Sequence, residues 1–193
     1  MRKLLLILLC VPLIGLGQIR VLIKDLQVEY DTILREDIYQ IHVFNDDYYY
    51  KGELFNGIGY SMHENGKLKF EANYKNGKLN GSIKGFYENG QLQMEGSMKD
   101  GYGEGPCKSY YENGQLQMEG SMKDGYGAGS IKMYYENGQL QEEGSYKNGM
   151  WDGVWKKYYE DGKIKEERKY KKGEHELIYK KCWNPDGNNI DCE

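Results

Sequence analysis

The sequence predicts an all-β protein, an elongated single-layer antiparallel β-sheet built from tandem β-hairpins of 24 residues each. The first observation is a segment of seventeen residues, YENGQLQMEGSMKDGYG, which occurs at 87–103 and again without change at 111–127. Copying of this kind is typical of stacked structural units. The second is that glycines and aromatic pairs recur at the same interval. The third is a composition of 19 tyrosines and 26 glycines with 39% hydrophobic residues, which suits a thin sheet better than a deep core.

Each repeat contains two turns that are marked by glycine. One carries Asn-Gly or Asp-Gly between stretches that favour strand, a strong hairpin signal because such a turn needs residues that tolerate positive φ. Its glycines are Gly66, Gly90, Gly114, Gly138 and Gly162. The other turn is expected to join one hairpin to the next, and it contains Gly77, Gly101, Gly125, Gly149 and Gly173.

Alternation with a period of two predicts a strand on each side of the hairpin turn. After the turn, Leu92, Met94 and Met98 alternate with Gln93 and Glu95, so one face is apolar and the other polar. An isolated hairpin is only marginally stable in water, so the units are expected to pair edge to edge. About five or six hairpins correspond to roughly 10 to 12 strands and to a sheet about 50 to 60 Å long.

The segment 1–17 is predicted to be a secretory signal peptide. Arg2 and Lys3 precede an apolar run, and Gly15 and Gly17 supply small residues where a signal peptidase cleaves. A membrane anchor is the alternative, but a membrane span needs roughly 20 apolar residues and this run is shorter. Cleavage near Gly17 would export the chain to the periplasm, the cell envelope or the exterior.

The charge balance gives no reason to expect nucleic acid or an anionic membrane as a partner. The full chain has 26 Lys and Arg against 30 Asp and Glu, a net charge of −4. Removing Arg2 and Lys3 with the signal peptide leaves 24 against 30, a net charge of −6. Both kinds of partner attract basic patches, and this composition supplies none.

Residues 18–48 do not follow the 24-residue period and are expected to form an N-terminal cap. Terminal units of repeat proteins are atypical because they must cover an exposed edge. A separate functional segment is the alternative for this region. Repeats are expected over 49–181, with 49–62 as a degenerate first unit because Gly57 falls in phase.

The last segment, 182–193, reads CWNPDGNNIDCE and is expected to form a final hairpin with a longer loop. Its two cysteines flank the turn at a separation that lets them face each other across the strands. In an exported protein this predicts a Cys182–Cys192 disulfide. Zinc and calcium are weaker alternatives, because the segment lacks C-x-x-C and EF-hand spacing. No cofactor is therefore predicted.

Two segments, YKNGKLNGSIKGFYENGQL and YKNGMWDGVWKKYYEDGKI, resemble the MORN repeat in its bacterial variant form. The resemblance covers approximately Tyr49 to Cys182 and implies a sheet of consecutive hairpins. The group includes YwqK-like proteins, the antitoxin-like component of a toxin–antitoxin pair. The resemblance is specific as to fold but leaves the function open, because this repeat is a scaffold reused for many partners.

The chain is predicted not to be an enzyme, because no set of reactive groups converges in the sequence. His42, His63 and His175 lie far apart. One Glu and one Lys recur in every repeat, which is typical of a solvated cross-strand row rather than an acid–base pair. The glycine-rich stretches match neither a phosphate-binding loop nor a dinucleotide unit. Cys107 shares the inward phase of Ile83, so a buried thiol is favoured over a reactive one.

We therefore expect a non-catalytic, exported interaction scaffold whose sheet face or edge binds another protein. Rigid amphipathic rings suit protein recognition, and the candidate contacts are Tyr110, Tyr134, Tyr158, Trp151 and Trp155. The opposing interpretation is that these rings replace aliphatic residues in a thin core.

The alternative function is that of a YwqK-like antitoxin or immunity protein that neutralises a cognate toxin. Association with a membrane surface, which the repeat's name implies, is disfavoured because the sequence shows no basic patch or amphipathic helix. The oligomeric state stays open.

Overall fold

A computed structural model of the chain describes residues 20–22, 27–28, 48–51, 53–171 and 176–192. The predicted signal peptide lies outside these residues, and so does most of the predicted N-terminal cap.

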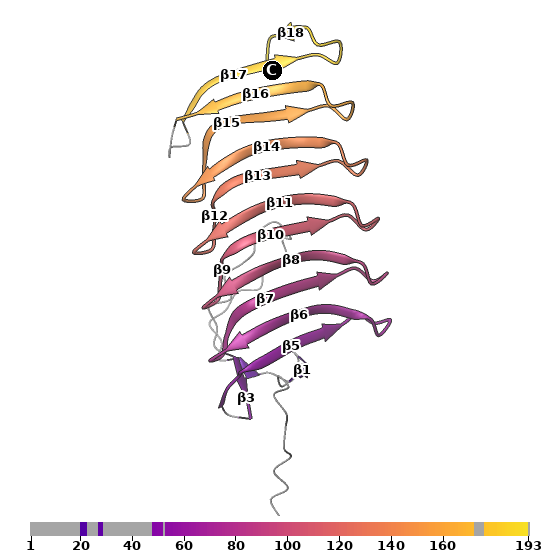
Figure 1. Cartoon of the computed structure of the whole chain (residues 1–193), viewed down its shortest axis with the longest axis vertical. Helices are drawn as coiled ribbons and strands as arrows, with labels where there is room; N and C mark the ends of the chain where they lie inside the picture. Colours follow the sequence, from indigo (N-terminus) through magenta and orange to yellow (C-terminus); the bar gives the residue numbers. More distant parts are fainter. Residues whose placement is uncertain (1–19, 23–26, 29–47, 52, 172–175, 193) are drawn as a thin grey trace, which may run out of the picture.

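The described residues form one long open sheet and a small second sheet at its N-terminal end. Figure 1 shows the strands of the long sheet side by side along the long axis in one layer. Their order is β1-β5-β6-β7-β8-β10-β11-β13-β14-β15-β16-β17-β18, with β9 beside β8 and β12 beside β11. The predicted single-layer antiparallel sheet of tandem hairpins is confirmed. One strand differs, because β1 pairs with β5 in parallel.

The strands of the N-terminal half are β1 (Arg20–Leu22), β2 (Gln27–Val28), β3 (Tyr48–Tyr50), β4 (Glu53–Leu54), β5 (Gly57–Met62), β6 (Leu68–Lys75), β7 (Lys78–Phe86), β8 (Leu92–Lys99) and β9 (Tyr102–Gly103). Those of the C-terminal half are β10 (Gly105–Tyr110), β11 (Leu116–Lys123), β12 (Tyr126–Gly127), β13 (Gly129–Tyr134), β14 (Leu140–Lys147), β15 (Met150–Tyr158), β16 (Ile164–Tyr170), β17 (Leu177–Trp183) and β18 (Asn189–Ile190). The small sheet has the order β2-β3-β4. The expected first repeat at 49–62 is therefore divided between the two sheets, since β3 and β4 belong to the small sheet and β5 belongs to the long one.

The two turns of each repeat differ in backbone geometry. In the four connecting turns between Lys75 and Met150 both central residues have positive φ, as at Asp124 (51°) and Gly125 (83°), which is the type I′ hairpin turn. In the Asn-Gly turns only the glycine has positive φ, as at Gly114 (86°). There the Gly114 N–H donates to the Tyr111 carbonyl, and the Tyr111 N–H donates to the Gln115 carbonyl. This pattern is a type I turn followed by a glycine bulge.

The asparagine of the Asn-Gly turn contributes through its side chain. Asn113 Oδ1 accepts the N–H of Gln115 at 2.8 Å, and Asn89 Oδ1 accepts the N–H of Gln91 at 2.8 Å. Asn89 Nδ2 also donates to the Glu112 carbonyl of the following repeat at 3.1 Å. Asparagine is therefore favoured here because it satisfies backbone groups within its own turn and in the next one.

Tyrosine hydroxyls connect successive repeats. The hydroxyls of Tyr87, Tyr111, Tyr135 and Tyr159 each donate to a backbone carbonyl of the following hairpin at 2.7–2.8 Å. In the first repeat His63 takes this role, with Nε2 2.8 Å from the Phe86 carbonyl oxygen. Each such bond contributes roughly 0.5–1.5 kcal/mol. The second ring of each aromatic pair thus stabilises the stacking of one repeat on the next.

Large side chains on one face of the sheet lie over glycines of the neighbouring strand. We call this the packing face, and it carries Ile83, Met98 and Trp155. The buried hydrophobic cluster lies in the N-terminal half of the sheet and consists of Phe55, Ala72, Tyr74, Leu79, Ile83 and Met98. In the C-terminal half Trp155 covers Gly144 so closely that a Cβ there would lie 2.1 Å from the indole ring. In such a thin sheet, glycine makes room for an aromatic ring.

The C-terminal hairpin corrects one expectation, since its loop is not longer than the others. The Gly187 N–H donates to the Asn184 carbonyl, which is the same span as in the Asn-Gly turns. The extra residue lies earlier, between β16 and β17. The strand register shows this. Lys156 and Lys181 both pair with Glu167 but are 25 residues apart, whereas the corresponding lysines of earlier repeats are 24 residues apart.

The predicted Cys182–Cys192 disulfide is confirmed. The two sulfur atoms are 2.04 Å apart, and the Cα atoms are separated by 5.4 Å. The bond closes a hairpin whose second strand, β18, has only two residues. So short a strand makes few ladder hydrogen bonds, and the disulfide holds it in place.

Replacing Gly144 by Ala should destabilise the protein strongly, whereas the equivalent change one repeat earlier should not. A Cβ at Gly144 meets the Trp155 ring at 2.1 Å, while a Cβ at Gly120 lies 3.6 Å from Ile131, an ordinary contact. We expect Gly144→Ala to lower the free energy of unfolding by at least about 2 kcal/mol because of overpacking. Gly120→Ala should change it by less than about 0.5 kcal/mol or raise it slightly. Urea denaturation measures both, and equal effects would contradict the packing described here.

Removing the disulfide should loosen only the C-terminal end. Replacing both Cys182 and Cys192 by Ser deletes a closed loop with a sequence separation of 10, worth roughly 2–3 kcal/mol. Repeats depend mainly on their neighbours, so amide exchange should accelerate in β17 and β18 and stay unchanged in β10 and β11. Cys107→Ser, which removes a free thiol, is the control. Faster exchange along the whole sheet would show that the hairpin stabilises more than its own end.

Candidate binding face

The face opposite the packing face carries one continuous row of alternating charges. Glutamates and lysines on neighbouring strands pair from β6 to β17. We call this the charged row, and its members in order are Glu71, Lys84, Glu95, Lys108, Glu119, Lys132, Glu143, Lys156, Glu167 and Lys181. The recurring glutamates of the sequence are thus a cross-strand row, and each from Glu95 to Glu167 has a lysine on both sides.

The row arises because each repeat contributes one strand with glutamate and one with lysine at matching register. Opposite charges on directly facing residues stabilise a strand pair by roughly 0.2–1 kcal/mol. At the N-terminal end Tyr60 of β5 lies directly opposite Glu71, and Arg20 of β1, whose guanidinium lies over the Tyr60 ring, forms an ion pair with Glu71. Sequence reasoning missed Arg20 because it lies outside the 24-residue repeats, whose spacing predicts the strand register.

Three of the predicted partner-binding tyrosines lie on this charged face and donate to the row. The hydroxyls of Tyr110, Tyr134 and Tyr158 donate to Oε1 of the glutamate of the preceding repeat at 2.9, 2.8 and 2.7 Å. We call these three residues the tyrosine row. Because successive strands lie about 4.8 Å apart, members of this row repeat every ~10 Å.

The glutamate contacts leave the tyrosine hydroxyls protonated over a wide pH range. Partial burial, followed by the hydrogen bond to Glu119, raises the pKa of Tyr134 to about 12. Burial and the contact with Glu143 raise the pKa of Tyr158 to about 12 as well. For Tyr110 the pKa is also raised, by burial first and then by Glu95. Each hydroxyl is thereby held as a donor to its carboxylate, and the ring is fixed by a bond at its far end.

The two predicted tryptophans do not join the tyrosines. Trp155 contacts Gly144, the neighbour of Glu143, and therefore lies on the packing face. It is 5% exposed and packs against Tyr146, with ring centroids 5.2 Å apart. The prediction that Trp155 offers a surface contact is therefore wrong, because a buried ring cannot meet a partner.

Trp151 lies on the same face as Trp155 and is half-buried. Its ring centroid is 5.8 Å from that of Trp155 and 4.8 Å from that of Tyr170. The five candidate residues thus divide between two faces of the sheet, three on the charged face and two in an aromatic cluster.

Charged side chains also lie on the packing face, near the C-terminal end of the sheet, where they take the place of apolar ones. Glu142 Oε2 is 3.8 Å from Lys157 Nζ, and Glu166 Oε2 is 3.4 Å from Lys180 Nζ. Burial raises the pKa of Glu142 although Lys157 opposes the shift. Glu142 and Glu166 stand where earlier repeats have Met94 and Met118, so the packing face changes from apolar to charged toward β17.

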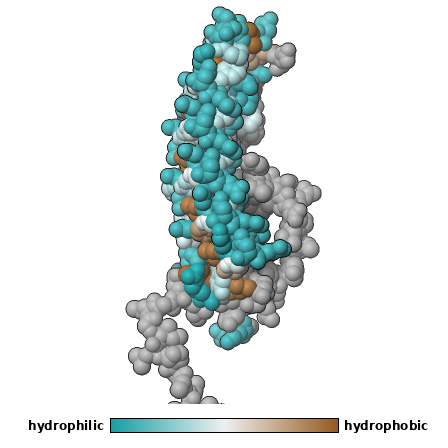
Figure 2. Space-filling view, turned by 90° about the vertical axis from the view of Figure 1, so that its right-hand side faces the viewer, coloured by the Kyte–Doolittle hydropathy of each residue, from teal (hydrophilic) through white to brown (hydrophobic). Residues whose placement is uncertain are grey.

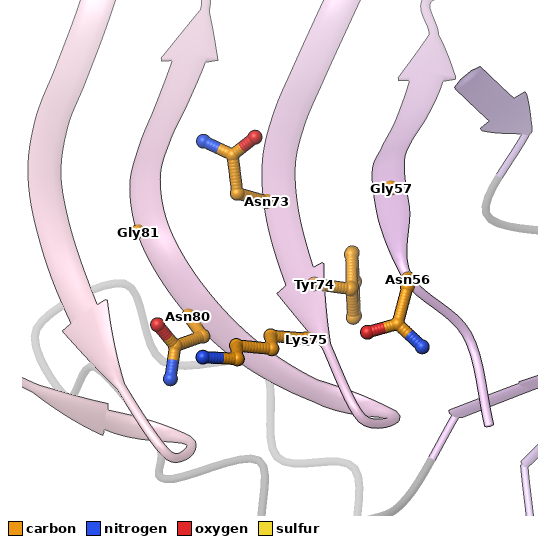
Figure 3. A pocket seen from close by; sticks show the side chains of 7 residues that line it. All are labelled: Asn56, Gly57, Asn73, Tyr74, Lys75, Asn80 and Gly81. Atoms are coloured by element: carbon orange, nitrogen blue, oxygen red, sulfur yellow. The ribbon is translucent and has the colours of Figure 1, made fainter. Parts of the chain in front are cut away.

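Two shallow depressions mark the sheet surface. One lies between β5, β6 and β7, where Figure 3 shows asparagine and lysine side chains around it. Its amides are already engaged, since Asn73 Nδ2 donates to Ser82 Oγ at 2.8 Å and Asn80 Nδ2 to Asp100 Oδ1 at 3.1 Å. The other lies on the charged face and is lined by Glu143, Gly144, Ser145, Val154, Lys156 and Glu167.

The side of the sheet formed by the Asn-Gly turns is narrow and mostly hydrophilic, as Figure 2 shows. Within the described ranges, no three His, Cys, Asp or Glu side chains come together in a way that would hold a metal ion. The same part of the chain contains no helix of the length and apolar character needed to cross a membrane. Burial raises the pKa of the Cys107 thiol, and the side chain is half-buried beside Gly96 and Ile83.

Alkaline pH should weaken the fold through the tyrosine row. The pKa of Tyr134 and Tyr158 is about 12 in the folded chain against about 10 in the unfolded chain. The unfolded chain therefore loses these protons first, so the stabilisation is complete below pH 10 and is lost as the pH rises to about 12. Urea denaturation from pH 9 to 12 measures this, and the variant with Tyr134→Phe and Tyr158→Phe should show a shallower decline. An equal slope in both proteins would contradict the assignment.

A comparison with known protein families identifies the family of the repeats. The family described as MORN repeat variant matches five segments, at 55–76, 79–100, 103–124, 129–148 and 151–172. A comparison with curated proteins found no match. The five segments follow the hairpins of the long sheet from the end of β4 to the end of β16, and together they cover more than half of the chain. The chain therefore belongs to the MORN repeat variant family.

Proposed function

We propose that this protein is a non-catalytic repeat scaffold that binds another protein through its charged face. The contact surface consists of the charged row and the tyrosine row, and it includes the depression lined by Glu143, Val154 and Lys156. Alternating charges select a partner by electrostatic complementarity, and tyrosine rings supply apolar contact area.

The observation that carries this proposal is the anchoring of each ring at its hydroxyl. Tyr110, Tyr134 and Tyr158 are half-buried, and each donates to a carboxylate at 2.9 Å or less. Ordering a free side chain on binding costs roughly 0.5–1.5 kcal/mol, and a ring already held in place avoids most of this. Three rings in the same environment, repeated every ~10 Å, suit an elongated or repetitive protein partner better than a small molecule.

We also propose that the protein works after export. The Cys182–Cys192 disulfide supports this, because such bonds persist in oxidising compartments and are rare in the cytosol. The predicted signal peptide at 1–17 is the second support.

A second candidate function is neutralisation of a cognate toxin, as in YwqK-like proteins. The acidic net charge of −4 favours a basic toxin as the target. The two functions differ in the number and nature of the partners. An antitoxin has one dominant, toxic partner encoded beside its own gene, whereas a scaffold binds several proteins of the envelope.

The test of the binding face is capture of partners by the mature chain from envelope and secreted fractions of its own source, followed by titration of each identified protein. The variant with Tyr110→Ala, Tyr134→Ala and Tyr158→Ala should lose at least about tenfold in affinity, since buried tyrosines are frequent hot spots. Tyr126→Ala is the matched control, because this ring is 64% exposed in β12, next to a connecting turn and away from the tyrosine row.

Circular dichroism must show that the triple variant is folded. Equal affinity of wild type and triple variant for every captured protein would reject the charged face as the binding site. A single captured protein that is toxic when expressed alone would favour the antitoxin function.

A further inference from the structure

The charged row leaves bonding capacity unused on its central strands. Glu95, Glu119 and Glu143 each accept a tyrosine hydroxyl at Oε1, and their Oε2 atoms have no hydrogen-bond partner among the described residues. In the same part of the chain, the ammonium groups of the lysines beside them form no hydrogen bond and no ion pair as close as 4 Å. These lysines are Lys84, Lys108, Lys132 and Lys156. The charged face thus presents acceptors and cations in alternation to whatever lies against it.

The charges alternate from strand to strand without a break. Glutamate stands on β6, β8, β11, β14 and β16, and lysine stands on β7, β10, β13, β15 and β17. Neighbouring strands lie about 4.8 Å apart, so the row from β6 to β17 spans ~43 Å. Figure 1 shows these strands side by side along the long axis with little change of direction. A partner that satisfies both signs needs charges that alternate at the same short interval.

A sheet face meets that requirement, whereas a helix does not. An α-helix laid along the row would repeat its side chains once per turn, every ~5.4 Å, and would fall about 5 Å out of register over the length of the row. A uniformly acidic protein would satisfy the lysines but would place carboxylates against the glutamates, which is unfavourable. The charged face of a second copy of this chain has both the required spacing and the required alternation.

Reversing the direction of the row exchanges its signs. A two-fold axis parallel to the strands, between β11 and β13, sets β11 against β13 of the second copy, β10 against β14, β8 against β15, β7 against β16 and β6 against β17. Every glutamate strand then meets a lysine strand. The tyrosine row lies on the lysine strands β10, β13 and β15, so its rings meet glutamate strands and not one another. Two copies that run in the same direction, or that are shifted by one strand, would set like charges opposite each other.

We propose that the charged face packs against the charged face of a second copy, with the two chains antiparallel about this axis. The proposal rests on the proposed function, because it names the protein that the charged face binds. Stacked sheets lie about 10 Å apart, a gap that a lysine and a glutamate side chain span together. The face from β6 to β17 measures ~43 Å by ~20 Å, so the pair would bury roughly 1,700 Å² in total, the size of a standard stable interface.

Zero-length cross-linking of the mature wild-type chain is the first test. A carbodiimide joins a carboxylate to an ammonium group that touches it and leaves no spacer between them. Glu95 and Lys156 lie five strands apart within one sheet, about 24 Å, so they can be joined only between two copies. We expect this link, and the link between Lys84 and Glu167, in the dimer band when its peptides are sequenced by mass spectrometry.

Charge reversal beside the axis is the second test. In Glu119→Lys, lysines of the two copies would face each other, and in Lys132→Glu, glutamates would face each other. By sedimentation equilibrium we expect each variant alone to dimerise at least about tenfold more weakly than wild type. An equimolar mixture should dimerise within about threefold of wild type, because opposite charges then meet at both positions. Damage to the fold of either variant would not be repaired by mixing.

Glu112→Lys is the matched control for net charge. This exposed residue lies in an Asn-Gly turn, outside the charged row, and its replacement changes the net charge as much as Glu119→Lys does. It should leave dimerisation unchanged. Should a reversal variant fail to fold by circular dichroism, Lys132→Gln removes one charge and should weaken dimerisation about threefold.

Three results would overturn the proposal. They are a chain that stays monomeric at concentrations on the order of 100 μM in low salt, a dimer that lacks the link between Glu95 and Lys156, and a mixture that dimerises no better than its components. The proposed function is tested separately, by capture of other proteins. Capture that depends on the tyrosine row would keep the charged face as a binding site even for a monomeric chain, whereas a monomeric chain whose captured proteins ignore the tyrosine row would reject both.

Discussion

Edge-to-edge pairing of hairpins is the constraint on which the rest of this structure depends. A two-stranded hairpin cannot bury enough apolar surface to be stable alone, and a single layer offers no second sheet to cover it. Each repeat is therefore stabilised by its neighbours, through the backbone ladder and through tyrosine hydroxyls that reach the next hairpin, as Tyr111 reaches the Tyr134 carbonyl. A hydroxyl and its carbonyl meet only when successive hairpins keep the same register, and the extra residue before β17 preserves that register, since Tyr159 still reaches the Trp183 carbonyl.

The same pairing separates the two faces of the sheet. Since side chains alternate along a strand, register that matches glutamate with lysine on one face matches glycine with large apolar residues on the other. Gly144 beneath Trp155 and Glu143 beside Lys156 are consecutive examples from one strand pair. The strand register therefore determines both the packing on one face and the charge pattern on the other. A shift of one strand by one residue would turn its charged side chains toward the aromatic cluster.

The ends of the sheet differ from each other, and this gives the molecule a direction. β1 pairs with β5, and Arg20 forms an ion pair with Glu71 there. At the other end a disulfide holds a two-residue strand over part of β17.

The sequence by itself determined the repeat length, the antiparallel hairpins, the family and the Cys182–Cys192 pairing, because each follows from spacing along the chain and from local backbone preferences. Only the tertiary structure decided which rings are available to a partner. Tyr158 and Trp155 lie three residues apart, yet one donates to Glu143 on the charged face and the other is buried over Gly144. The difference comes from what lies opposite on the neighbouring strand, and for the same reason the sequence could not place the extra residue before β17 or show that Arg20 forms an ion pair with Glu71.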